Sequence, residues 1–340
     1  MRLTIQCGVV KLTNFKQNVL DREYNAVQDV IKLNANDIDW VDVKIYSANK
    51  QQAIRYFKRY KSKEYPISLR NDLINVKKTK SFWFLKIPVY GVRGGIRIPI
   101  KPHREFPDNF KICESKLIKR NGKYIAMVTI EFDTPKLRRC SSVLAVDLGE
   151  RFAATAVLLQ DGSVMKVRFM GKEIRGIRRH YSWLRKRLQE RGLTKIVKRI
   201  GKKENHCVSN ILNNISKKIV GLADSTDSCI VLGNLKGIRK HSRGRKFNRI
   251  VSNMTFYKLT WMIKYKAEEV GIPVLEVDES YTSKTCHICG RIGRRKMQGL
   301  FVCKTCGEYN ADLNGAINIA KRLTSYMLVG GAFCEQALNA

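Results

Sequence analysis

A short apolar segment that ends in a lone carboxylate, Val143 to Gly149 (VLAVDLG), constrains the fold more than any other stretch of this chain. Such a run is typical of a strand buried on both faces, and an aspartate near its end is costly to bury unless it is paired, hydrogen-bonded or bound to a cation. A hairpin pattern follows, with Ala153–Leu159 apolar, Asp161-Gly162 as a turn pair and Val164–Phe169 alternating. The segment therefore predicts a strand, a terminal carboxylate and an antiparallel meander. On this segment alone, Asp147 could equally be a surface aspartate.

The charge of the chain points to a polyanionic partner. Lys and Arg number 65 against 29 acidic residues, a formal net charge of +36 over 340 residues. This excess favours nucleic acid, although a ribosomal or chromatin-type packing protein would share it. No stretch approaches the ~20 apolar residues of a membrane span, and the first fifteen residues are too polar for a secretory signal. We expect a soluble, intracellular protein with no membrane partner.

The first 140 residues predict a small antiparallel β-barrel with helices inserted into it. Residues 1–12 and 76–140 are rich in β-branched and aromatic residues and are interrupted by turn signals, which is typical of an oligonucleotide-binding-like barrel. Residues 13–75 contain two helical patterns, the second starting at Ser47, and form a predicted helical domain. Its basic side chains could be an ordinary solvated face or could contact a phosphate backbone.

The pattern after the hairpin alternates helices and buried strands. Helical periodicity runs from about residue 172 to 223, residues 229–232 (CIVL) form a short strand, and residues 255–270 a further helix. Another strand, 272–277, precedes the cysteine-rich segment, and a last helix covers about 311–323. The residues predicted to contact nucleic acid are Arg55, Lys58 and Arg59 in the first region, and Lys236, Arg239, Lys240, Arg243 and Arg245 in a basic loop after CIVL.

Four of the ten cysteines form two matched CxxC pairs, Cys286/Cys289 and Cys303/Cys306. Four thiolates at this spacing can close a tetrahedron around one Zn²⁺, and four protein ligands leave no open position, so the zinc would be structural. A redox dithiol is the alternative, which the two matched pairs disfavour. His287 lies inside the first pair and is expected to be a bystander.

Four motifs together resemble the TnpB family of transposon-encoded RNA-guided endonucleases, which is related to the compact type V CRISPR effectors. They are VLAVDLG, LGNLKGIRK, VLEVDESYTSKTCHICG and CGEYNADLNGAINIAKR, and the dense part of the resemblance spans residues 141–325. The resemblance implies an α/β, RNase H-like (RuvC) nuclease domain at 141–281 and 311–328. It also implies a target-binding zinc ribbon inserted at 282–310 and a loose tail at 329–340. Residues 1–12 and 76–140 would be the wedge barrel, and 13–75 the recognition domain.

The resemblance further implies three catalytic carboxylates that hold two Mg²⁺ or Mn²⁺ ions, of which the first matches Asp147 and the third Asp312. The second departs from the family pattern, because Gly233 stands where a glutamate normally follows the CIVL strand. Since neighbouring strands lie only ~4.8 Å apart, a glutamate just past the adjacent strand could fill the vacated place. We therefore predict Glu279 as the relocated carboxylate. Asp278 is the less favoured substitute, and Glu276 is expected to face the other side of the sheet.

The family resemblance implies an RNA-guided DNA endonuclease whose partners are a transposon-end-derived guide RNA and double-stranded target DNA with a short adjacent motif. A separate transposase is a further expected partner, and the expected location is the cytoplasm of a prokaryote, at the nucleoid. The alternative is a nuclease-dead, RNA-guided DNA-binding repressor, which Gly233 would favour; a third reading is an unguided RuvC-type nuclease. Asn314 and Asn318 on the last helix could support the site, contact DNA, or only satisfy local hydrogen bonds.

Overall fold

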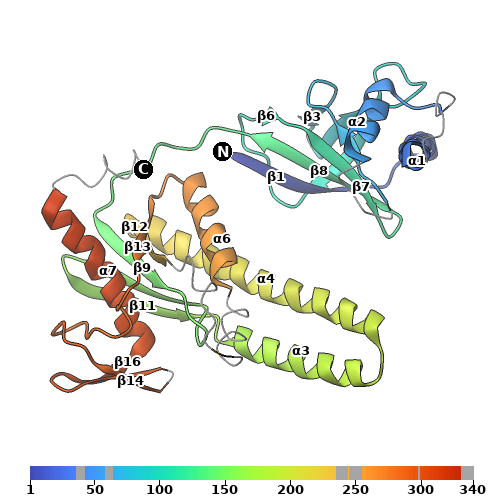
Figure 1. The fold of residues 1–340 in the computed structure, drawn as a ribbon. Helices are drawn as coiled ribbons and strands as arrows, with labels where there is room; N and C mark the ends of the chain where they lie inside the picture. Colours follow the sequence, from blue (N-terminus) through green and yellow to red (C-terminus); the bar gives the residue numbers. More distant parts are fainter. Residues whose placement is uncertain (36–42, 58–63, 235–243, 245–254, 298, 331–340) are drawn as a thin grey trace. The chain divides into compact units, whose positions relative to one another are not determined.

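The computed structural model describes all of the chain except residues 36–42, 58–63, 235–243, 245–254, 298 and 331–340 (Figure 1). The chain separates into two compact units, Met1–Asp133 and Thr134–Ala340, which are taken in turn. The first unit ends at Asp133, a few residues earlier than the end at residue 140 that the sequence predicted for the barrel. No helix in the described ranges is long and apolar enough to cross a membrane.

The first unit is built on an antiparallel sheet with the order β2-β7-β8-β1-β5-β4-β3, to which β6 adds by pairing with β8. The N-terminal strand β1 lies between β5 and β8. It therefore belongs to this sheet, as the sequence predicted. The pairings of the described strands stop at β2 and β3, so the expected antiparallel barrel is present as a half-barrel. Its strands are β1 (Arg2–Val9), β2 (Ile67–Leu69), β3 (Asn75–Lys78), β4 (Trp83–Ile87), β5 (Ile96–Pro102), β6 (Lys111–Ile112), β7 (Ser115–Arg120) and β8 (Lys123–Glu131).

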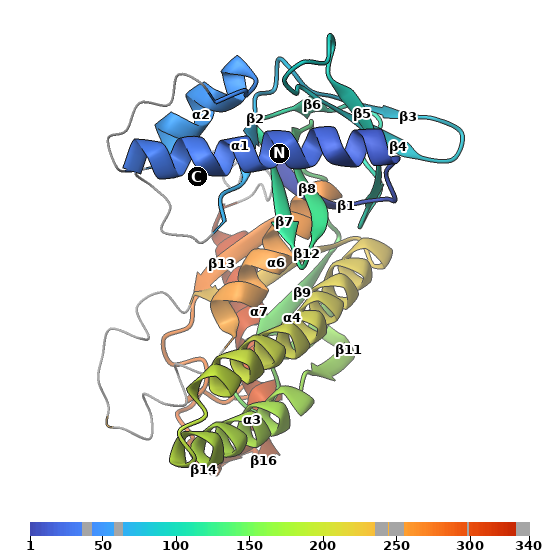
Figure 2. The same cartoon turned by 90° about the vertical axis from the view of Figure 1, so that its right-hand side faces the viewer.

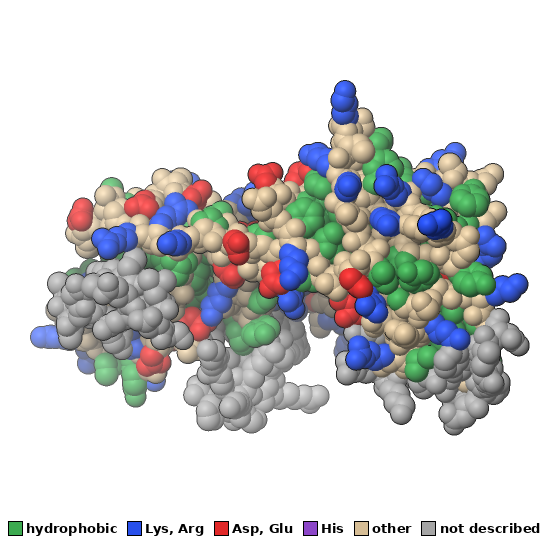
Figure 3. All heavy atoms as spheres, turned by 90° about the horizontal axis from the view of Figure 1, so that it is seen from above, with side chains coloured by type: hydrophobic (Ala, Val, Ile, Leu, Met, Phe, Trp, Pro, Cys, Tyr) green, Lys and Arg blue, Asp and Glu red, His purple; other side chains and the backbone are tan. Residues whose placement is uncertain are grey.

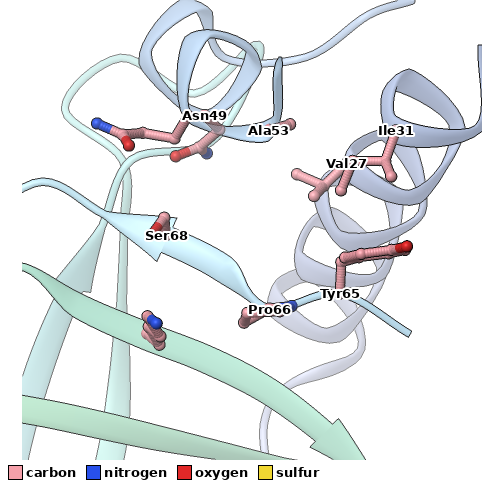
Figure 4. A pocket seen from close by; sticks show the side chains of 9 residues that line it. Val27, Ile31, Asn49, Ala53, Tyr65, Pro66 and Ser68 are labelled. Atoms are coloured by element: carbon pink, nitrogen blue, oxygen red, sulfur yellow. The ribbon is translucent and has the colours of Figure 1, made fainter. Parts of the chain in front are cut away.

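Two helices, α1 (Asn14–Ala35) and α2 (Ser47–Phe57), pack on this sheet and share its apolar core (Figure 2). The buried carboxylate of Glu23 on α1 joins them, because it accepts hydrogen bonds from the Asn49 side chain and the Tyr46 backbone. A narrow cavity remains between α1, α2 and β2 (Figure 4), with room for about one water molecule. One expectation is corrected: β2 lies inside the predicted helical region 13–75, since three buried residues are too few to show a strand period.

The second unit contains a five-stranded sheet of order β11-β10-β9-β12-β13. Strands β9 to β11 form the predicted antiparallel meander, and β12 runs parallel to both β9 and β13. The predicted adjacency of the strand before Asp278 and the CIVL strand is therefore confirmed. The strands are β9 (Ser142–Asp147), β10 (Ala154–Gln160), β11 (Ser163–Met170), β12 (Ser228–Asn234) and β13 (Val274–Asp278).

Helices cover both faces of this sheet, and the alternation along β9 decides which residue meets which layer. Leu144 and Val146 pack against α4 (Thr194–Ser225) and α6 (Phe256–Glu269), and α3 (Glu173–Glu190) lies along α4. Val143 and Ala145 pack against α7 (Ala311–Gly330) on the other face (Figure 1). Asp147 follows Ala145 by two residues and therefore lies on the same face of the sheet, the face that α7 covers.

The cysteine-rich segment forms a separate three-stranded sheet of β14 (Arg294–Met297), β15 (Leu300–Cys303) and β16 (Gly307–Asn310). Phe301 and Cys303 are buried in its small core together with Cys286. The segment leaves the large sheet after β13 and leads directly into α7, so it separates the second predicted carboxylate from the third. The helix α7 continues to Gly330, beyond the end predicted at 323, and so the start of the predicted loose tail is helical.

Candidate active site

Asp147 ends β9 and is partly buried against the first turns of α7. A Cβ atom at Gly315 would lie 3.0 Å from its Oδ2 atom, so the carboxylate rests closely on the helix backbone. Desolvation, followed by the negative charge of Asp312, raises the pKa of Asp147 to about 7. This environment does not fit the alternative of an ordinary surface aspartate, whose pKa would stay near its usual value.

Glu279 reaches back from the loop after β13 and fills the space above Gly233. In the parallel register Leu232 lies beside Val146, so Gly233 is the neighbour of Asp147 on the same face of the sheet. A Cβ atom at Gly233 would lie 1.6 Å from Oε1 and 2.1 Å from Cδ of Glu279. Burial and then the charge of Asp147 raise the pKa of Glu279 to about 8.

The two other acidic residues of this segment point elsewhere. Asp278 is exposed, and its carboxylate accepts hydrogen bonds from Ser280 and pairs with Arg322 at 3.4 Å. Glu276 pairs with Lys264 of α6 at 2.9 Å, on the opposite face of the sheet. Glu279 is thus the acidic residue that the structure brings beside Asp147.

Asp312 lies in the first turn of α7 and is buried. The Asn310 side chain accepts hydrogen bonds from the backbone N–H groups of Asp312 and Leu313, at 3.0 and 3.1 Å, and so fixes the helix start. Oδ1 of Asp312 accepts a hydrogen bond of 2.8 Å from Arg295 on β14. Sequence reasoning missed Arg295, since nothing in the run RRK distinguishes the arginine that pairs with Asp312 from the other exposed basic residues beside it.

Two of the three carboxylates have an unpaired oxygen atom that could bind a divalent cation. Oε1 of Glu279 and Oδ2 of Asp312 are buried and have no hydrogen-bond partner among the described residues. Burying carboxylates in this way is unfavourable unless cations compensate them, and hard oxygen donors suit Mg²⁺ or Mn²⁺. Within the described part of the chain, only the four cysteines gather three or more such ligand atoms within 4.8 Å.

The four predicted zinc ligands come together. The Sγ atoms of Cys286, Cys289, Cys303 and Cys306 lie within 4.8 Å of one another and could hold one metal ion. Hydrogen bonds from backbone N–H groups lower the pKa of the Cys303 thiol to about 6. A hydrogen bond with the Cys289 side chain instead raises the pKa of the Cys306 thiol to about 12. A cation is therefore needed to keep all four deprotonated. The His287 ring bonds to Asn314, so it is not part of the cluster.

We expect the purified chain to carry about one Zn²⁺ and the Cys289→Ser variant to carry none, because a site with three thiolates loses the closed tetrahedron. Metal content measured by plasma emission checks this. Cys207→Ser, which replaces an exposed cysteine on α4, is the matched control and should keep the metal. Equal zinc in both variants would contradict the assignment.

Of the residues predicted to contact nucleic acid, Arg55 is the one within the described part of the chain. Arg55 lies in the last turn of α2. Lys58, Arg59, Lys236, Arg239, Lys240, Arg243 and Arg245 lie outside the described residues. A basic surface within the described part is α3, where Arg187 stacks 4.4 Å above the ring of exposed Trp183.

Residues 256–319, which hold Glu279, Asp312 and all four cysteines, match the family described as "Cas12f1-like, TNB domain". Over 76 residues the chain is 50% identical to the CRISPR-associated endodeoxyribonuclease Cas12f1 of Sulfoacidibacillus thermotolerans, covering 22% of this chain and 18% of that protein. It is also 27% identical to a TnpB-like protein of Methanocaldococcus jannaschii over 224 residues, 63% of this chain and 79% of that relative. The chain is thus similar to TnpB-like proteins and to the Cas12f endodeoxyribonucleases.

A solved structure extends the likeness to the fold. A cryo-EM structure titled as the Cas12f1–sgRNA–target DNA complex superposes with a TM-score of 0.59 and covers 90% of this chain and 82% of that one. The identity is 14%, so this likeness concerns the fold. The expected relation to the compact type V effectors is confirmed.

Proposed function

We propose that this chain is an RNA-guided DNA endonuclease of the TnpB type with an RNase H-like, RuvC-type active site. The observation that carries the proposal is the Glu279 carboxylate above Gly233, which supplies the acidic group that β12 lacks. The meander of β9–β11 followed by parallel β12 and β13 supports the fold assignment. The names of the Cas12f1 relatives as endodeoxyribonucleases support the reaction.

In this proposal Asp147, Glu279 and Asp312 would hold two Mg²⁺ or Mn²⁺ ions, which supply an activated water and stabilise the leaving oxygen in an in-line displacement at phosphorus. The chain's own contribution is to hold three carboxylates rigidly at a strand end, a loop and a helix start. Arg295 neutralises part of the charge of Asp312 while the site is free of metal. The cysteine ribbon, residues 282–310, would be the structural zinc domain of the target-binding region.

Guide RNA and target DNA are the proposed partners. The basic side chains spread over the face seen in Figure 3 suit contacts with a phosphate backbone at many points. Guide pairing would then specify the sequence, while the protein recognises shape and the short adjacent motif. The wedge and recognition roles of the first unit, the transposase partner and the nucleoid location stay predictions.

The deciding experiment purifies the full chain with its co-expressed transposon-end RNA and adds plasmid DNA that matches the guide, with Mg²⁺. We expect cleavage of matched plasmid and none of a mismatched plasmid or in EDTA. Retention of matched DNA without cleavage would favour the nuclease-dead repressor instead. Cleavage that ignores the guide would favour the unguided nuclease.

The raised pKa values predict how pH affects the stability of the metal-free protein. Asp147 and Glu279 titrate with pKa values of about 7 and 8 when folded, above the values near 4 of unfolded carboxyl groups. The folded state then binds more protons than the unfolded state between these limits, so stability falls as pH rises from about 4 to 8. We expect Asp147→Asn, which keeps the shape without the charge, to melt several degrees above the unmodified protein in EDTA at about pH 8.

Thermal melts in EDTA at about pH 5 and about pH 8 check this prediction, since the difference between the two proteins should be small at the lower pH, where the buried carboxyl is protonated. Glu308→Gln, which replaces an exposed glutamate on β16, is the control and should change neither melt. An Asp147→Asn variant that melts below the unmodified protein at the higher pH would refute the desolvation argument.

A further inference from the structure

One face of α7 carries three polar side chains at a spacing of four residues: Asn314, Asn318 and Arg322. This spacing stacks them along a single stripe of the helix. The two asparagines are buried, at 0% and 8% exposure, although asparagine is usually exposed. A buried amide needs partners for both its donors and its acceptor, so this stripe, called the α7 ladder below, must be hydrogen-bonded to something specific.

The partners are backbone groups of one segment, residues 278–287, between β13 and the first cysteine pair. Asn318 donates hydrogen bonds to the carbonyl oxygens of Thr282 and Thr285 at 2.8 and 2.7 Å.

Asn314 and Arg322 hold the two ends of the same segment. The Asn314 side chain donates a hydrogen bond to the carbonyl oxygen of Thr285 at 2.8 Å and accepts one from the backbone N–H of His287 at 2.9 Å. Arg322 donates to the carbonyl oxygens of Asp278 and Ser280. The α7 ladder thus holds this segment along its whole length.

Glu279 lies within the segment that the ladder holds. Both the backbone N–H and the hydroxyl of Thr282 donate to the carbonyl oxygen of Glu279, at 3.1 and 2.9 Å, and Thr282 is itself held by Asn318. Tyr281 between them has φ of +64°, a left-handed conformation that costs a non-glycine residue roughly 1–2 kcal/mol. The turn therefore needs support from outside, and its register determines where the Glu279 side chain starts.

A glutamate carried by β12 would be fixed by the hydrogen bonds of the sheet. Glu279 follows the end of β13 and lacks that support, yet its carboxylate has to lie beside Asp147 in the same place. Asn314 also fixes the cysteine cluster, because it hydrogen-bonds to the backbone of Thr285 and His287, the residues on either side of Cys286. The segment is therefore fixed at one end by β13, at the other by the cysteines, and between them by the ladder.

We propose that the α7 ladder positions Glu279, so that a loop-borne glutamate can replace the strand-borne one. The proposal rests on the proposed metal-dependent function of the carboxylate site. Asn314, Asn318 and Arg322 are positioning residues, because they reach the site through the backbone of the segment and not through the carboxylate. The sequence signal is the repeated spacing in Asn314-x-x-x-Asn318-x-x-x-Arg322, directly after Asp312.

The test moves the glutamate back to the strand. Asn318→Ala is made in the unmodified chain and in a background carrying Gly233→Glu with Glu279→Ser, and Mn²⁺ affinity is measured by calorimetry on the zinc-loaded full chain. In the unmodified chain we expect about 10–100-fold weaker Mn²⁺ binding, the usual cost of losing an outer contact of a metal ligand. In the swapped background we expect no change, because β12 itself would hold the glutamate introduced at position 233. Asn214→Ala on the exposed side of α4 is the matched control.

Hydrogen exchange at the Thr282 amide gives a readout that needs no divalent ion at the carboxylates. Asn318→Ala should speed this exchange in both backgrounds, since the ladder is weakened in both. Equal losses of Mn²⁺ affinity in the two backgrounds, or unchanged exchange at Thr282, would overturn the proposal. If the unmodified chain binds no Mn²⁺, the proposed function fails, and the exchange result alone decides whether the ladder holds the Glu279 turn.

Discussion

Glu279→Gln should reduce guided DNA cleavage by roughly 10³-fold or more, which corresponds to about 4 kcal/mol of lost transition-state stabilisation. The amide keeps the size of the side chain above Gly233 but removes the charge that a divalent ion requires. Because basic side chains, and not Glu279, are proposed to contact the phosphate backbones, guide and target binding should persist. Single-turnover cleavage of matched DNA by the RNA-loaded protein, followed by gel analysis, measures the loss, and filter binding measures retention of the target.

The matched control is Glu276→Gln, three residues earlier on the same segment. Its carboxylate pairs with Lys264 on the opposite face of the sheet, so its neutralisation should leave cleavage within about a factor of two. If Glu276→Gln loses as much cleavage as Glu279→Gln, then any substitution in this segment impairs cleavage, and the loss in Glu279→Gln does not indicate a specific role of its carboxylate. Full cleavage by Glu279→Gln would show that the second carboxylate comes from elsewhere.

Local patterns made much of the second unit predictable. The apolar run before Asp147, the turn pair Asp161-Gly162 and the following alternation are each complete within a few residues, and the meander follows from them. The two CxxC pairs specify their ligands by spacing alone. The adjacency of β12 and β13 came from the RNase H-like sheet that the family resemblance implies, and this brought Glu279 under consideration.

The contacts that complete the site were not predictable, because they join residues distant in sequence through side chains with many exposed equivalents. Arg295 is one of 65 basic residues, and only the three-dimensional structure shows that its guanidinium meets Asp312. Asn314 and Asn318 left three readings open, and the structure shows both bonded to the Glu279 segment. Closure of the first sheet depended on whether β2 and β3 meet, which no local pattern encodes.

Gly233→Ala should lower the rate of DNA cleavage without lowering the melting temperature of the protein. A Cβ atom there would lie 1.6 Å from Oε1 of Glu279, so the two groups cannot coexist. The obstructing atoms, Oε1, Cδ and Cγ, all belong to this one flexible side chain, which we expect to turn away towards solvent at little cost to the fold. Such displacement of a catalytic group by an ångström or more should lower cleavage about 100-fold.

The same displacement should leave the metal-free protein as stable as before or more stable, for two reasons. Alanine costs less chain entropy than glycine in a strand, by roughly 0.5–1 kcal/mol. The displaced Glu279 also regains water and moves away from Asp147, and so loses the burial and then the neighbouring charge that raised its pKa to about 8. A variant that melts no lower than the unmodified protein, yet cleaves about 100-fold more slowly, is the signature of a carboxylate kept in an unfavourable place for its function.

Gly221→Ala provides the matched control, because a Cβ atom at Gly221 on α4 would meet open space. It should gain helix stability of up to about 1 kcal/mol and cleave at the unmodified rate. Melting in EDTA and single-turnover cleavage are compared for the three proteins. Cleavage by Gly233→Ala at the unmodified rate would mean that the Glu279 carboxylate is not needed above residue 233, which removes the geometric basis of the relocated site. A large drop in melting temperature would instead mean that Glu279 cannot turn aside, and that the glycine is required by the fold.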